Sequence, residues 1–142
     1  MCVILQPTIM TVMATKTAKQ KFTLEYIIKS PPHILFEFLT EPSELNQWFA
    51  DHVDSNGKNY VFEWDGTTQK ATVVDMMEDQ MVRFHWDGTP KEEYFEFRIE
   101  ISEVANETVL MIADFCDPRE MKDQTRLWDQ QVLELKRHMG SV

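Results

Sequence analysis

The stretch SPPHILFEFLTEPSELNQWF, residues 30–49, decides how the fold begins. Ser30 and the two prolines after it are typical of a helix start, because a serine side chain can cap the helix and proline has no N–H to lose there. The Thr-Glu-Pro break at residues 40–42 ends this helix and starts another, since proline cannot continue a helix. We therefore predict two short consecutive helices, the second of which ends on the aromatic pair Trp48 and Phe49.

Strand-like alternation of apolar and polar side chains lies on both sides of these helices. It is typical of strands with one buried face. Asn-Gly and Asp-Gly pairs between the later segments are typical of hairpin turns. We predict one strand before the helices and a run of about six antiparallel strands after them. The predicted strands are residues 20–29, 52–54, 60–64, 68–77, 81–86, 93–103 and 108–115.

The C-terminal part predicts one long helix. Asp117 is expected to cap it, Pro118 fits its first position, and Gly140 ends it. The order of elements predicts an α+β fold, in which this helix covers the concave face of a curved antiparallel sheet of about six to seven strands. Its apolar face, spaced by four and three residues, is predicted to be Met121, Thr125, Trp128, Val132, Leu135 and Met139.

The length of 142 residues fits a single domain, which we place at residues 20–140. Residues 1–19 are predicted to be a disordered leader or an over-extended start, because Met10 and Met13 are equally good initiators. No run of the sequence reaches the roughly 18–20 apolar residues that a membrane helix needs.

The net charge of −10 disfavours two classes of partner. Nucleic acid and anionic membrane surfaces would both repel the chain, so neither is expected to bind. Cys2 and Cys116 lie far apart and have no metal-binding spacing, so free thiols are expected. Free thiols are typical of a reducing compartment, and the expected location is the cytoplasm.

The order of the predicted elements and four stretches of the sequence resemble the START-like (helix-grip, SRPBCC) superfamily, and within it the heat-shock-chaperone ATPase-activator homologues. Residues 30–49 are similar to the family's early motif, GKNYVFEWDG at 57–66 to its Gly-then-aromatic strand, and RFHW at 83–86 to its central strand ending in Trp. RLWDQQVLELKRH at 126–138 stands where the family has its Trp- and Leu-bearing helix. The resemblance covers residues 20–140.

The resemblance implies the fold more strongly than the function. The superfamily includes lipid carriers, plant-hormone receptors, polyketide cyclases and chaperone co-factors, and its members commonly hold an apolar ligand between the long helix and the sheet. In this chain the segment after Trp86 is short and has no long pocket-gating insertion. A sterol-sized ligand is therefore disfavoured.

No residue pattern predicts a catalytic site. The histidines at 33, 52, 85 and 138 show no metal-ligand spacing, and no metal or cofactor is predicted. His85 is expected to face outward if Phe84 and Trp86 face the core, whereas the opposite phase would bring it into the cavity as an acid or base. Glu63 and Asp75 lie among apolar residues and are further candidates for an inward polar group. The acidic stripe of Glu92, Glu93, Glu96 and Glu100 is expected to be a solvated outer face.

The resemblance, together with the apolar residues that could line a cavity, implies a non-enzymatic domain that binds a small hydrophobic or amphipathic ligand between the C-terminal helix and the sheet. Trp48 and Phe49 are expected at the mouth of the cavity. One alternative is a chaperone-linked or other protein-interaction module that acts through its surface on a partner or a second copy. A polyketide-cyclase-like enzyme is less favoured. The predicted walls of the cavity are Phe36, Trp48, Phe49, Phe62, Trp64, Phe84, Trp86, Phe97, Met111 and Trp128.

Overall fold

The structure, a computed structural model, describes residues 19–140. The predicted leader lies outside the described residues apart from Lys19. None of the described helices is long and apolar enough to cross a membrane. The helices and strands follow in the predicted order: β1 (Gln20–Ile28), α2 (Pro32–Thr40), α3 (Pro42–Trp48), β2 (His52–Asn56), β3 (Asn59–Trp64), β4 (Thr67–Met77), β5 (Met81–Trp86), β6 (Phe95–Ser102), β7 (Glu107–Cys116), a 3-10 turn (Pro118–Glu120) and α4 (Met121–Met139).

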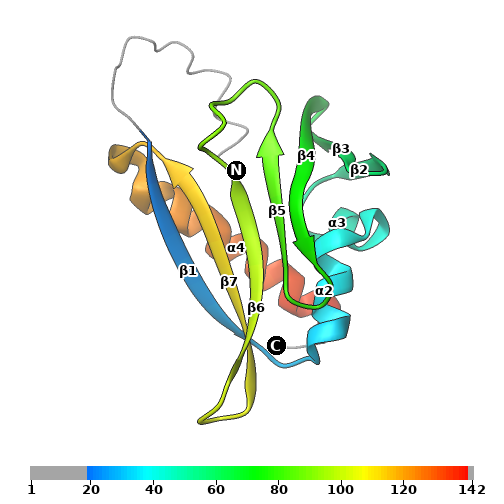
Figure 1. Cartoon of the computed structure of the whole chain (residues 1–142), viewed down its shortest axis with the longest axis vertical. Helices are drawn as coiled ribbons and strands as arrows, with labels where there is room; N and C mark the ends of the chain where they lie inside the picture. Colours follow the sequence, from blue (N-terminus) through cyan, green and yellow to red (C-terminus); the bar gives the residue numbers. More distant parts are fainter. Residues whose placement is uncertain (1–18, 141–142) are drawn as a thin grey trace.

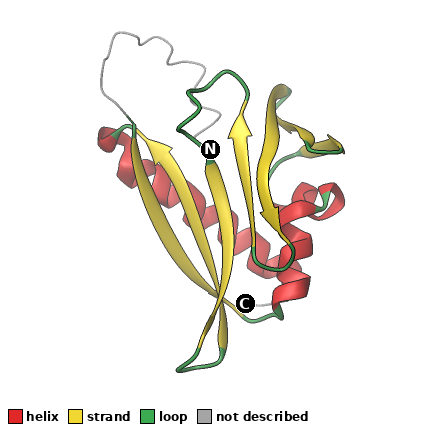
Figure 2. Ribbon diagram, in the orientation of Figure 1, coloured by secondary structure: helices red, strands yellow, loops and turns green. Residues whose placement is uncertain are grey.

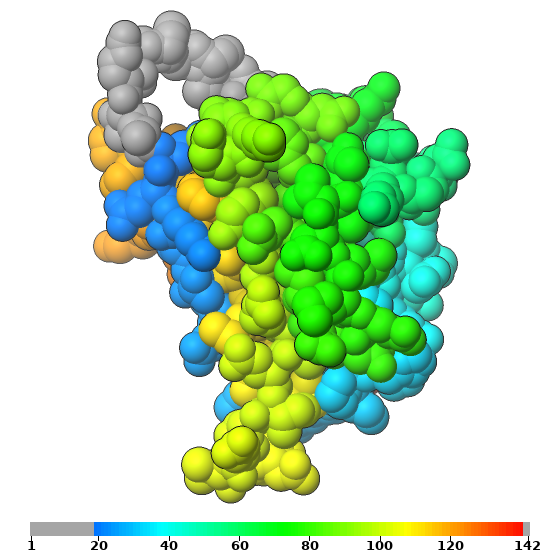
Figure 3. Space-filling view, in the orientation of Figure 1, coloured from blue at the N-terminus to red at the C-terminus, as the bar shows by residue number. Residues whose placement is uncertain are grey.

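The strands form one seven-stranded antiparallel sheet in the order β1-β7-β6-β5-β4-β3-β2. Helix α4 crosses behind β1, β7 and β6, while α2 and α3 lie on the same side near β4 and β3 (Figures 1 and 2). The predicted α+β helix-grip fold and its number of strands are thereby confirmed. Figure 3 looks onto the opposite face, which the strands themselves form.

The two prolines place the start of α2 one residue later than predicted. Pro31, and not Ser30, is the N-cap, with φ −65° and ψ 151° and no side-chain hydrogen bond. A residue that precedes proline is pushed into extended backbone, so Pro31 cannot join the helix and Pro32 becomes its first residue. Glu41 is both the C-cap of α2 and the N-cap of α3.

The start of α4 and its buried face both differ from the prediction. Asp117 accepts a hydrogen bond from the Arg119 N–H at 2.8 Å, but it caps a 3-10 turn, and the α-helix begins at Met121. Trp128, Val132 and Leu135 of the predicted apolar face are buried. Gln124 is also fully buried, whereas Thr125, Met121 and Met139 are only half-buried.

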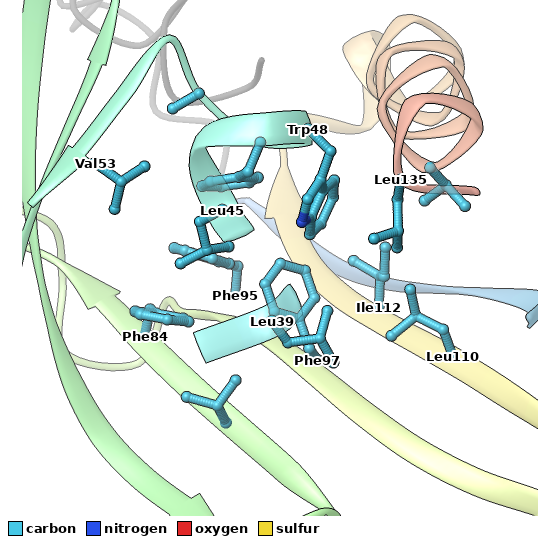
Figure 4. Close-up of a cluster of buried hydrophobic side chains, with 14 of the residues drawn as sticks. Leu39, Leu45, Trp48, Val53, Phe84, Phe95, Phe97, Leu110, Ile112 and Leu135 are labelled. Atoms are coloured by element: carbon cyan, nitrogen blue, oxygen red, sulfur yellow. The ribbon is translucent and has the colours of Figure 1, made fainter. Parts of the chain in front are cut away.

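The core fills the space between the helices and the sheet. Side chains from α2, α3, four strands and α4 converge in Figure 4, and most of them are almost fully buried. Apolar burial of this extent is the main stabilising contribution to the fold. The labelled side chains are Leu39, Leu45, Trp48, Val53, Phe84, Phe95, Phe97, Leu110, Ile112 and Leu135.

The outer face is not the simple solvated surface that the acidic stripe predicted. Glu96 is only 7% exposed. Its carboxylate lies 2.7 Å from Nη2 of Arg83 and 3.2 Å from Nε of Arg98, and the Arg83 guanidinium lies 4.1 Å from the centre of the Tyr94 ring. The prediction for Glu96 was wrong because Arg83 on the neighbouring strand β5 and Arg98 on its own strand β6 lie beside it.

The β6–β7 hairpin extends beyond the end of the body in Figure 3. Ile101 is in phase with the buried Phe97 and Ile99 of β6, but it is half exposed there, and Val104 in the connecting turn is fully exposed. Strand alternation buries a side chain only where another layer covers the sheet, and the hairpin extends past that layer.

Candidate functional site

Phe49 lies at the centre of an aromatic cluster beneath α4. Its ring centroid lies 5.1 Å from that of Phe62 and 5.5 Å from that of Trp64. It also stacks on Phe95 at 5.7 Å and on Trp128 at 6.0 Å, and is only 1% exposed. Edge-to-face and offset-stacked pairs at these separations are favourable aromatic contacts. The expected position of Phe49 at a cavity mouth was therefore wrong, because α3 directs this ring into the middle of the core.

The structure brings nine of the ten predicted wall residues together on the helix-covered side of the sheet. Eight of them belong to the buried core, and Trp86 is half-buried against it. Met111 is the exception, because it alternates with the buried Leu110 and Ile112 and so lies on the other face of β7. The nine residues are Phe36, Trp48, Phe49, Phe62, Trp64, Phe84, Trp86, Phe97 and Trp128.

A second part of the interior is polar and follows one side of α4. The indole N–H of Trp128 donates to Oδ2 of the buried Asp114 at 2.9 Å. One turn later, Nε2 of Gln131 donates to the carbonyl oxygen of Phe49 at 2.9 Å, while its Oε1 is buried without a hydrogen-bond partner among residues 19–140. We call Asp114, Gln124, Trp128 and Gln131 the polar strip.

Gln124 is the least satisfied member of the polar strip. Its side chain is fully buried, and neither Nε2 nor Oε1 has a hydrogen-bond partner in the described part of the chain. Such a group costs free energy, because it has lost its hydrogen bonds to water without a replacement. An amide in this state can donate to and accept from a bound molecule at the same time.

Sequence reasoning missed Gln124 for an identifiable reason. It lies four residues before Trp128 and therefore shares a helical face with it, which is a visible pattern. The spacing of four and three residues counted from Met121, however, placed Thr125 on that face. Gln131 was missed because its position beside Phe49 depends on the contact between α3 and α4, which lie far apart in sequence.

A groove of about 370 Å³ opens beside this end of the interior. It lies where α3, the start of β2 and the end of β3 meet α4. Gln131 is common to the groove and to the polar strip, so the strip reaches the surface at this point. The groove is lined by Asn46, Gln47, Trp48, Phe49, Ala50, Asp51, Trp64 and Gln131.

The three residues considered as inward acids or bases are placed elsewhere. Phe84 is fully buried, and His85 on the opposite phase has Nε2 3.1 Å from the carbonyl oxygens of both Thr89 and Pro90. Asp75 is exposed. Glu63 is half-buried, between the buried Phe62 and Trp64 that point the other way.

Cys116 does not provide a nucleophile either. The side chain is buried at the end of β7. Burial, with a smaller contribution from Asp114, raises the pKa of the Cys116 thiol to about 11. The thiol is therefore protonated at neutral pH, and the reactive thiolate is scarce.

Comparisons with known proteins agree with this architecture. The family model described as a START-like superfamily domain matches residues 16–141. A solution structure of BfR322 from Bacteroides fragilis is 35% identical, with 86% of this chain and 92% of that chain covered and a TM-score of 0.62. No curated protein matches the chain.

Two more distant structures share the fold alone. The Aha1 dimer from Colwellia psychrerythraea is 19% identical, covers 82% of this chain and 93% of its own, and has a TM-score of 0.69. MLL2253 from Mesorhizobium loti is 16% identical, covers 85% and 97%, and has a TM-score of 0.71. The family match and the 35% identical relative confirm the resemblance found in the sequence, and the chain belongs to the START-like superfamily.

Proposed function

We propose that this protein is a non-enzymatic binding domain for a small amphipathic molecule held against the polar strip of α4. The observation that carries the proposal is the fully buried Gln124 amide, which has no hydrogen-bond partner among residues 19–140. Membership of a superfamily known for ligand binding supports it. The rings around Phe49 contact one another closely, so we place the ligand beside the polar strip and not at the centre of the aromatic cluster.

The chemistry of the polar strip restricts the ligand. Gln124 offers both a donor and an acceptor, and Gln131 offers a free acceptor. Asp114 accepts the hydrogen bond from the Trp128 indole. Its buried carboxylate disfavours an anionic ligand in the polar strip. A neutral, mainly apolar molecule with an adjacent hydrogen-bond donor and acceptor fits these groups. Most of its affinity would come from buried apolar area, at about 25 cal/mol per Å² before ordering costs.

The test is native mass spectrometry of the gently purified full chain, with solvent extraction and identification of any bound molecule. We expect a small neutral ligand with the wild-type protein and none with Gln124→Met, which keeps the length of the side chain but removes both polar atoms. Gln130→Met is the matched control, because Gln130 is an exposed glutamine of the same helix. Equal retention by the two variants would overturn the proposed site, as would a wild-type protein that carries and binds nothing.

A second candidate function is a protein-interaction module, and a groove beside α2 favours it. The groove has a volume of about 410 Å³ and is lined by Phe36 and the half-exposed Met76, with Glu37, Glu41 and Glu78 around them. An apolar floor with acidic walls fits a basic amphipathic segment of a partner. The structure with the same fold from Colwellia psychrerythraea is described as a dimer, so a second copy of this chain is the other partner to test.

The interaction module is tested with a fluorescent amphipathic peptide of lysine and leucine, followed by anisotropy at two salt concentrations. We expect salt-sensitive binding that Met76→Ser and Glu41→Gln weaken. Glu100→Gln, a change at an exposed carboxylate on β6, is the control. Binding that is equally strong in all four proteins would exclude the groove. Light scattering on the same samples shows whether the chain forms a dimer.

A further inference from the structure

His33 and the β4–β5 turn form a cluster of potential metal ligands outside the polar strip. His33 lies in the first turn of α2, and Glu78 and Asp79 lie in the turn between β4 and β5. One ligand atom from each of these three side chains lies within 4.8 Å of the other two. It is the one such group of three found among residues 19–140.

The separations within the cluster fit coordination of one ion. Nδ1 of His33 lies 3.0 Å from Oδ1 of Asp79. Two ligands on a tetrahedral zinc ion, with bonds of about 2.0–2.1 Å, lie roughly 3.3 Å apart. The distance between His33 and Asp79 is close to this value, and His33 and Glu78 are exposed side chains that can rotate. An imidazole with two carboxylates is a ligand set suited to Zn²⁺ and related transition metals, and the imidazole separates it from an ordinary group of surface acids.

The other nitrogen of the same imidazole lies near a further carboxylate. Nε2 of His33 lies 3.5 Å from Oε2 of Glu37, one turn later on α2. Metal-ligating histidines usually direct their second ring nitrogen at a carboxylate, which orients the ring and increases its basicity. Glu37 is thus placed as an orienting residue, and this contact is independent of the distances among the three ligands.

The backbone of the turn also positions its ligand. Asp79 has φ 61°, in the left-handed region that few residues other than glycine, asparagine and aspartate adopt readily. This conformation places Asp79 opposite His33, which lies 46 residues earlier in the chain. The contact joins α2 to the β4–β5 turn.

We propose that His33, Glu78 and Asp79 bind one divalent transition-metal ion, with Zn²⁺ as the probe, and that Glu37 orients the histidine. With three protein ligands, a fourth position stays open to water or to a partner's side chain. The ion would connect the start of α2 to the β4–β5 turn, and it would lie at one end of the acidic groove beside Phe36. The site is separate from the polar strip and does not depend on the function proposed above.

The test is isothermal titration calorimetry of the untagged full chain with ZnCl₂, at a pH of about 8 where imidazole is mostly neutral. We expect one ion bound per chain. His33→Gln should remove this binding phase. Asp79→Asn should weaken it by about tenfold or more, and it keeps a side chain that tolerates the left-handed conformation. Glu37→Gln should weaken it by about tenfold through loss of orientation.

His52→Gln is the control, because His52 is an exposed histidine outside the cluster. It should leave the isotherm unchanged, and thermal unfolding of each variant without zinc shows that the fold is intact. A wild-type chain without stoichiometric binding would overturn the proposal. Binding that survives His33→Gln and Asp79→Asn would do so as well, because the ion would then be held elsewhere.

Discussion

Two neighbouring regions beneath α4 differ in whether their buried polar atoms have hydrogen-bond partners. Around Phe49, large rings contact one another from every side and the polar atoms at the margin have partners, such as the Trp64 indole N–H that donates to the Phe49 carbonyl oxygen at 2.8 Å. Around Gln124, a buried amide has no partner within residues 19–140. The first region stabilises the fold, whereas the second reduces its stability.

This difference separates residues that build the fold from residues that bind. A ligand that entered the aromatic cluster would have to displace ring contacts that already stabilise the protein. A ligand at Gln124 would supply hydrogen bonds that the folded chain lacks, so its binding would relieve an existing cost. The substitutions below test this contrast, beginning with the largest expected effect.

Phe49→Ala should destabilise the protein most. It removes the ring at the centre of the cluster and leaves a cavity, which typically costs about 3–5 kcal/mol in the free energy of unfolding. The measurement is urea unfolding followed by circular dichroism. Val104→Ala, at a fully exposed position, should change stability by less than about 0.5 kcal/mol. A loss at Phe49 as small as the control would show that the cluster is not tightly packed.

Trp128→Phe tests the point where the two regions meet. It keeps an aromatic ring beside Phe49 but removes the N–H that donates to Asp114 at 2.9 Å. We expect a loss of about 1.5–3 kcal/mol, the range for hydrogen bonds to charged groups. A double-mutant cycle with Asp114→Asn measures the coupling between the two side chains. Coupling below about 0.5 kcal/mol would assign the loss to packing alone.

Gln124→Met should have the opposite sign. In ligand-free protein it replaces an unsatisfied buried amide with an apolar side chain of similar length, so we expect a gain of about 1 kcal/mol or more. Gln130→Met, at the exposed position of the same helix, should be close to neutral. A loss of stability in Gln124→Met would show that the amide already has a hydrogen-bond partner, such as buried water, and would remove the basis of the ligand proposal.

The two regions also differ in how far the sequence predicts them. The alternation that includes Phe62, Trp64 and Phe84 predicts their common face. A strand has only two faces, and a one-residue error would move all its apolar side chains to the solvent side, so the pattern specifies the buried face strongly. Phe49 was assigned correctly to the interior side but wrongly to its mouth. Its depth is set by the angle between α3 and the sheet, which no local pattern specifies.

The polar residues were predicted less well because their roles depend on contacts between distant segments. Gln124 and Thr125 lie four and three residues before Trp128, and the packing of α4 on the sheet decides which of them is buried. His33 and Asp79 are 46 residues apart, so spacing rules for metal ligands do not find them. Apolar periodicity therefore predicts the fold of this chain, whereas the candidate sites require its tertiary structure.

Tyr60→Phe should give the smallest of the four effects and the clearest contrast with Gln124. The Tyr60 ring lies in the aromatic cluster, 5.2 Å from Phe84, and its buried hydroxyl donates to the carbonyl oxygen of Thr40 at 2.7 Å. Burial raises the pKa of Tyr60, so the hydroxyl remains a donor at neutral pH. Removal of this satisfied hydroxyl should cost about 0.5–1.5 kcal/mol.

Tyr94→Phe is the matched control, because Arg83 contacts the face of that half-exposed ring on the outer side of the sheet. It should change stability by less than about 0.5 kcal/mol. Tyr60→Phe and Gln124→Met both remove polar atoms from the interior, and the expected changes have opposite signs because only one of these groups has a partner. Equal losses from both would mean that Gln124 is as well satisfied in solution as Tyr60, and the two regions would then be alike.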